Sequence, residues 1–169
     1  MTGDPARRTS TGRPLRLVRS TDEGTDDRDR YRDDPGTDED ALTVDLPPQR
    51  RSVAVGRHWV VRVAAEQGVT GMANQVLELL TSELLANAVL HATAVAPDRP
   101  LRLEFARDDA VARVAVTDHA HQPPVVLHPE PVAPAGRGMA IVEAMSERWG
   151  VAEAAQGKTV WFEIALDEY

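Results

Sequence analysis

Cysteine is absent from this 169-residue chain, and aromatic residues make up only 4% of it. Without cysteine there is no disulfide framework and no thiolate metal site, a composition that fits a reducing, cytoplasmic environment. Because aromatic side chains are scarce, valine, leucine, alanine and isoleucine must build the core, with Trp59, Trp149 and Trp161 as bulky exceptions. No apolar run reaches the length of a membrane span, and the first residues lack the apolar segment of a signal peptide, so we expect neither.

Lysine is nearly absent, and acidic residues outnumber basic ones. The formal net charge is -8, and Lys158 is the only lysine. A negative surplus is repelled by a phosphate backbone, so direct binding to nucleic acid is not expected.

The first forty residues differ from the rest of the chain. Residues 1–19 are basic and residues 21–40 are strongly acidic, with few apolar side chains between the charges. Such a segment cannot bury enough apolar surface to offset the entropy lost on ordering. The sequence therefore predicts a disordered charged tail over residues 1–40 and one folded domain over residues 41–169. A partner-binding arm is the alternative for the tail.

Within the folded part, segments of period two alternate with segments of helical period. Strands are expected at residues 42–46, 101–105, 111–118, 149–153 and 159–164. Helices are expected from Pro47-Pro48 to about Gly68, over residues 72–92 with Thr70 able to cap it, and over residues 139–145. This order predicts an α/β (α+β) two-layer sandwich, in which a mixed, mostly antiparallel sheet carries about three helices on one face.

The central helix carries the most unusual pattern. Six apolar residues are predicted to share one face, with Glu83 and Asn87 in its middle and His91 at its edge: Met72, Val76, Leu79, Leu80, Leu84 and Leu90. Polar groups buried without partners are costly, so something polar should meet them there. Neighbouring backbone is one alternative. Two such residues one turn apart favour a site, because a carboxylate can accept a proton and an amide oxygen can hold Mg²⁺.

Asp118 ends the inward face of its predicted strand, after Val114 and Val116. A carboxylate at that place is either a turn or helix-capping group or a ligand-binding group. A proline-rich loop follows over residues 119–134, and loops of this length are usually functional or mobile. Its three histidines, His119, His121 and His128, are read as solvated loop residues, with a metal cluster as the less favoured alternative.

Gly136-Arg137-Gly138 stands directly before the helix that begins at Met139. Glycines at a loop-to-helix junction let backbone N–H groups approach an anion, and the helix dipole adds to the attraction. A plain turn is the alternative.

Taken in order, these features resemble the GHKL ATP-binding family, which includes gyrase and histidine kinases. The likeness covers residues 42–166. It is closest to a short regulatory branch of anti-sigma factors that are also serine kinases, with many actinobacterial relatives. The residues that carry it are Ser82-Glu83-Leu84, Asn87-Ala88, His91, Asp118, Gly136-Arg137-Gly138-Met139-Ala140 and Gly157-Lys158-Thr159-Val160-Trp161-Phe162. One departure is clear: the family's Asp-x-Gly-x-Gly reads Asp118-His119-Ala120-His121-Gln122 here.

The resemblance implies a role for each matching position. Glu83 would be the general base, Asn87 would hold Mg²⁺, and Asp118 would accept a hydrogen bond from the adenine amino group. Gly136, Arg137, Gly138 and Met139 would surround the phosphates. Thr159 would place a hydroxyl near the base and Asp118.

The resemblance also implies a function. The protein would bind ATP or ADP with Mg²⁺ and would act as a serine/threonine protein kinase on an anti-sigma-factor antagonist. It would also bind a sigma factor. Relatives of this kind suggest a homodimer. The alternative is a nucleotide-binding or degenerate protein-interaction module without turnover. A sensor histidine kinase fragment is a third, weaker reading, since no helical segment with a phospho-acceptor histidine precedes the domain.

Overall fold

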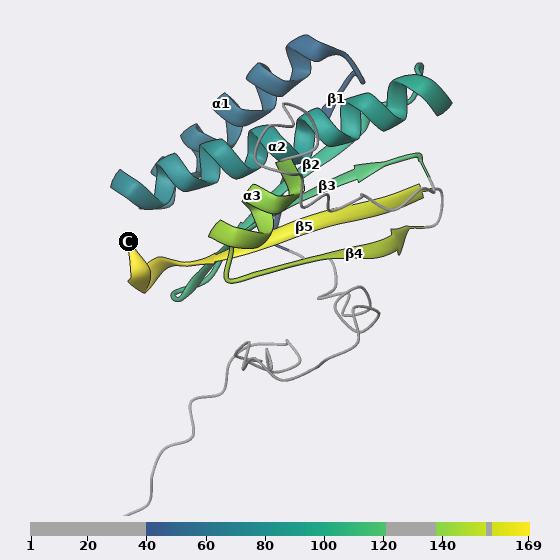
Figure 1. The fold of residues 1–169 in the computed structure, drawn as a ribbon. Helices are drawn as coiled ribbons and strands as arrows, with labels where there is room; N and C mark the ends of the chain where they lie inside the picture. The colour runs from purple at the N-terminus through teal and green to yellow at the C-terminus, as the bar shows by residue number, and fades with distance from the viewer. Residues whose placement is uncertain (1–39, 121–137, 155–156) are drawn as a thin grey trace, which may run out of the picture.

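The computed structural model describes residues 40–120, 138–154 and 157–169. Residues 1–39 of the predicted tail, residues 121–134 of the predicted loop, and Gly136 and Arg137 lie outside these ranges. The elements in chain order are β1 (Leu42–Leu46), α1 (Arg50–Glu66), α2 (Gly71–Val95), β2 (Leu101–Arg107), β3 (Val111–Asp118), α3 (Gly138–Met145), β4 (Arg148–Ala154) and β5 (Gly157–Ala165), followed by a short 3-10 turn (Leu166–Glu168) (Figure 1).

The five strands form one sheet in the order β1-β2-β3-β5-β4. Each of the four ladders between these described strands is antiparallel. The helices α1, α2 and α3 lie on the same side of this sheet (Figure 1). The predicted two-layer sandwich is therefore confirmed, and its sheet is antiparallel rather than mixed in the part that the structure describes.

The core lies between the helices and the inward side chains of β2, β3 and β5. Phe105, Val114 and Phe162 are each 0% exposed. Along the ladder of β3 and β5, Val114 pairs with Phe162, and Val116 pairs with Val160. The next pair in the same alternation is Asp118 with Lys158. Because partners across an antiparallel ladder point to the same face, this charged pair is the last row of the core surface.

Gly56 allows α1 and α2 to pack closely. A Cβ atom at this position would lie 2.5 Å from Cδ1 of Leu85 and 2.9 Å from Cδ1 of Leu46. By propensity alone, glycine inside a helix is unfavourable. The structure instead gives it a packing reason, since any side chain would push α1 away from α2 and β1.

The apolar face of α2 differs in part from the prediction. Leu77, Leu80, Leu84, Leu85 and Val89 are buried as expected for a core helix. Met72, Leu79 and Leu90, which were assigned to the same face, are 57%, 39% and 71% exposed. The helix is apolar on several sides, so leucine spacing alone does not fix which side meets the sheet. Glu83 and Asn87 consequently lie half-buried beside the core face rather than in its middle.

Two smaller expectations also need correction. Thr70 is the N-cap residue of α2, but its side chain makes no capping hydrogen bond.

Trp161 is buried, yet it alternates with the core residues of β5 and lies on the sheet face away from the helices. There the guanidinium carbons of Arg113 and Arg148 are 5.0 Å and 5.7 Å from its ring centre. Two cation–π contacts therefore help to cover it on that face.

Candidate functional site

Glu83 and Gly138 meet where α2 packs against the first turn of α3. A Cβ atom built on Gly138 would lie only 2.5 Å from Oε2 of Glu83, a separation that real side chains do not tolerate. The glycine therefore lets the carboxylate lie directly against the backbone that begins α3. Two residues that the sequence places in separate motifs are brought together by the fold.

The position of Glu83 affects its protonation. Burial raises the pKa of the Glu83 carboxyl above its ordinary value of 4.5, because the charged form loses hydration. A carboxylate with a raised pKa is a better proton acceptor at neutral pH than an ordinary one. This is the environment that a general base needs.

Asn87 and His91 follow Glu83 along α2 at intervals of one turn, and all three are half-buried. The amide oxygen of Asn87 is a donor that suits Mg²⁺, which keeps several waters and takes substrate phosphates as further ligands. Gly138 lies against the Glu83 carboxylate on the same flank. The residues therefore fit the ion. Within the described ranges, no three or more histidine, aspartate or glutamate side chains gather as a metal centre.

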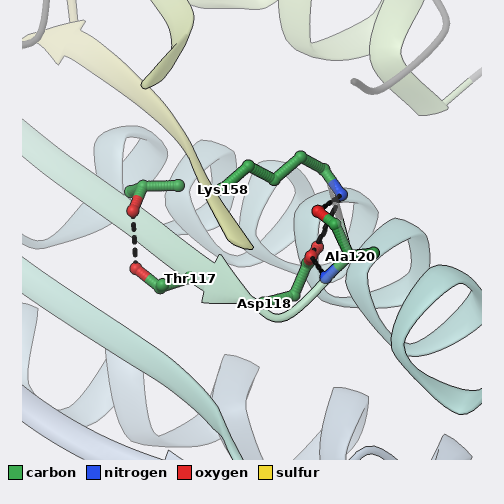
Figure 2. A network of polar contacts seen from close by, with 5 residues as sticks. Thr117, Asp118, Ala120 and Lys158 are labelled. Carbon is green, nitrogen blue, oxygen red and sulfur yellow. Dashed lines mark hydrogen bonds and ion pairs between the residues drawn. The ribbon is translucent and has the colours of Figure 1, made fainter. Parts of the chain in front are cut away.

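Asp118 is fully buried at the end of β3, and its carboxylate accepts three hydrogen bonds (Figure 2). Lys158 Nζ donates to Oδ1 and to Oδ2, each at 3.0 Å, and the backbone N–H of Ala120 donates to Oδ1 at 2.7 Å. Lys158 Nζ also donates to the carbonyl oxygen of Ala120 at 3.2 Å. The pair is only 3% and 0% exposed, so removing either partner alone would strand a buried charge.

Gly157 allows Lys158 and Asp118 to come close enough to pair. Its φ is 141°, and a Cβ atom on it would collide with the carbonyl oxygen of Asp118. Only glycine is comfortable in this backbone region, and only glycine lets the start of β5 pass so close to the end of β3. Lys158, the next residue, is thereby aimed at the carboxylate.

The structure does not bring Thr159 to Asp118. Thr159 pairs with Thr117 across the ladder, and their hydroxyl oxygens are 2.7 Å apart. Figure 2 shows Thr117 away from the Asp118–Lys158 pair, as alternation along the strands requires. The expected hydroxyl near Asp118 is thus replaced by the ammonium of Lys158. The sequence contained a signal for this placement of Lys158. Side chains on one face of a strand recur at every second residue, so Lys158 shares the inward face with Val160 and Phe162.

The remaining expected site residues fall into two groups. Met139 is 3% exposed and packs in the hydrophobic core, so its side chain supports α3 and only its backbone lies at the helix start. Gly136 and Arg137 lie outside the described residues. His119 is described and approaches Arg99, with 3.4 Å between Nδ1 and Nη1, whereas His121 and His128 lie outside.

None of the helices that the structure describes combines the length and the apolar character needed to cross a bilayer.

The described site thus combines a half-buried glutamate and asparagine on one helix, a glycine at the start of the next, and a buried aspartate at a strand end. Residues 46–164 match the family described as the histidine kinase-like ATPase domain. Since the match spans well over half of the chain, the protein belongs to this family. A comparison with curated protein sequences gave no match.

Solved structures agree on the fold. Seventeen chains match, among them the crystal structure of the RsbU and RsbW domains of Rv1364c from Mycobacterium tuberculosis. That match has a TM-score of 0.57 and 20% sequence identity, and it covers 73% of this chain. The matched region is 32% of the Mycobacterium tuberculosis chain, so the protein corresponds to about a third of that molecule. At this identity the likeness establishes the fold.

Proposed function

We propose that the protein is a Mg²⁺-dependent, ATP-binding regulatory protein with serine/threonine protein kinase activity. Its substrate would be an anti-sigma-factor antagonist protein, and a sigma factor would be its second partner. Membership of the histidine kinase-like ATPase family supports the ATP-binding part. The observation that carries the catalytic part is the contact between the Glu83 carboxylate and Gly138, which joins a proton acceptor to the start of α3.

In the proposed reaction, Glu83 takes the proton from a serine or threonine hydroxyl as its oxygen attacks the γ-phosphorus of ATP. The bond between the γ-phosphorus and the β–γ bridging oxygen breaks, and ADP leaves with the electron pair. The backbone at Gly138 and the residues before it would face the phosphates, as helix starts do. Asn87 would hold Mg²⁺, which supplies neutralisation of phosphate charge.

Asp118 would select the base. A carboxylate accepts a hydrogen bond from the amino group of adenine, whereas guanine presents a carbonyl oxygen at the same place. The buried position of Asp118 strengthens this discrimination, because an unmatched charge is costly away from water.

A binding module without turnover is the second candidate. Two observations favour it, and the first is that the Asp118 carboxylate is already held by Lys158 and Ala120. Side chains also stand at the two positions after Asp118 where the family pattern has glycine, at Ala120 and Gln122. Both features would weaken nucleotide binding without changing the fold.

Replacing Glu83 with Gln separates these candidates. The amide keeps the shape and removes the proton acceptor, so ATP should still bind while phosphoryl transfer falls about 10²–10⁴-fold. The matched control is Glu78→Gln, which removes the same charge from the same helix at an exposed ion pair with Arg57. Calorimetry measures ATP binding, and labelled ATP with candidate protein acceptors measures transfer. Unchanged transfer in Glu83→Gln would exclude Glu83 as the base. No transfer in the unmodified protein, with ATP bound, would favour the binding module.

A further inference from the structure

The Asp118 carboxylate has little hydrogen-bonding capacity left. Oδ1 accepts from Lys158 and from the backbone of Ala120, and Oδ2 accepts from Lys158. The ammonium is equally committed, since its acceptors Oδ1, Oδ2 and the Ala120 carbonyl match its three protons in number. Each partner thus satisfies the other, and both are shielded from solvent.

A ligand that needs Asp118 must compete with this arrangement. The amino group of a base has to reach a carboxylate oxygen that Lys158 already contacts, and Asp118 has no exposed surface through which to approach. An amino group and a lysine ammonium are alike in what they offer, because both are N–H donors. Lys158 therefore holds the position that the base amino group would take.

The sheet supplies a second place for the displaced ammonium. Lys158 pairs with Asp118 across the β3–β5 ladder and with Glu153 across the β4–β5 ladder. Cross-strand partners project from the same face with Cβ atoms about 4.5–5.5 Å apart. Glu153 is exposed, whereas Asp118 is buried. Lys158 on β5 thus lies between Asp118 on β3 and Glu153 on β4, in one row of cross-strand partners.

We propose that Lys158 sets the affinity for the nucleotide base by occupying Asp118, and that base binding transfers its ammonium from Asp118 to Glu153. This inference rests on the proposed nucleotide function and adds a residue that controls it. Because an ion pair must be exchanged before the amino group is accepted, the chain should bind adenosine weakly. The phosphates would contribute most of the affinity for ATP.

The first test uses the fact that Lys158 is the only lysine. The full-length protein is treated with an amine-acylating reagent, with and without adenosine, and the modified peptide is followed by mass spectrometry. A buried ammonium reacts slowly, so its transfer towards exposed Glu153 should increase the rate of acylation at Lys158 several-fold. The N-terminal amine, read in the same sample, is the internal control. Slower acylation with adenosine would overturn the proposal, since it would mean that the base covers Lys158.

The second test compares variants by calorimetry with adenosine and with Mg²⁺-ATP. Lys158→Met removes the competitor and should tighten adenosine binding about tenfold, the scale of one hydrogen bond to a charged group. Glu153→Gln removes the receiving carboxylate and should weaken it. Arg102→Met is the matched control, because it breaks an exposed ion pair with Asp45 elsewhere in the sheet. If Lys158→Met does not fold, the adenosine affinity of Glu153→Gln and the acylation rates of Lys158 test the proposal instead.

The outcomes separate this inference from the proposed function. If the unmodified protein binds Mg²⁺-ATP and Lys158→Met binds adenosine no more tightly, Lys158 is a structural partner of Asp118 and the inference fails alone. If neither protein binds ATP or adenosine while both remain folded, the nucleotide function and the inference fail together.

Discussion

Gly138→Ala tests the centre of the site with one added methyl group. The new Cβ atom would lie 2.5 Å from Oε2, 3.5 Å from Cδ and 3.6 Å from Cβ of Glu83. Ordinary contact begins at 3.4 Å, so only the carboxylate oxygen has to move, and it must retreat by about 0.9 Å. The clash is with the far end of a flexible side chain, which can turn away without disturbing the helices.

A displacement of this size should matter for catalysis and little for folding. Misplacing a reacting group by about 1 Å can cost about 10²-fold in rate, so phosphoryl transfer should fall by that factor. The melting temperature should change little, because alanine is a better helix former than glycine. Transfer at saturating ATP and thermal unfolding, measured on the same samples, give the two quantities.

A double-mutant cycle shows whether the effect passes through Glu83. If Gly138→Ala acts by moving the carboxylate, it should cost nothing further in a Glu83→Gln background. A second loss of about 10²-fold in that background would mean that Gly138 matters for the phosphates instead. Full activity of Gly138→Ala alone would refute the reasoning, since a general base cannot tolerate the shift that the contact imposes.

Two further predictions concern the same helix flank. Asn87→Ala should remove the Mg²⁺ dependence of ATP binding in calorimetry, with exposed Gln75→Ala as control, and a persisting Mg²⁺ effect would exclude Asn87 as a ligand. Burial raises the pKa of Glu83, so the folded protein holds this proton more tightly than the unfolded chain, and stability is lost as pH rises from about 4.5 through the folded pKa. The free energy of unfolding in urea should therefore rise for Glu83→Gln relative to the unmodified protein as the pH increases across that range. A difference between the two proteins that does not change with pH would contradict the prediction.

Much of the fold follows from local pattern. The alternation of Leu101, Leu103 and Phe105 predicts a half-buried strand, and all three are fully buried in β2. The turn at Asp108 is equally local, because its Oδ1 accepts hydrogen bonds from the backbone of Ala110 and Val111. Period and turn chemistry act over a few residues, so a single sequence contains them.

The residues that escaped prediction depend on contacts between distant segments. Which side of α2 is buried depends on how the helix sits on α1, α3 and the sheet, and Leu90 is exposed although it is as apolar as Leu84. The choice between Lys158 and Thr159 depends on the register between β3 and β5. A one-residue change of register exchanges the two faces of a strand, and no short motif determines it.

The two carboxylates of the site are compensated in opposite ways. Asp118 accepts three hydrogen bonds, whereas Glu83 lies against glycine backbone with its charge disfavoured by burial. A chain selected for stability alone would be at least as well served by apolar side chains at both places. This difference agrees with the two proposed roles. A proton acceptor such as Glu83 must keep its lone pairs available, whereas a recognition group such as Asp118 can be hydrogen-bonded to another donor until the base binds. In the proposed exchange, binding of the base would have to break the Asp118–Lys158 pair, whereas Glu83 would need no comparable rearrangement, so base binding would be the step at which this chain is regulated.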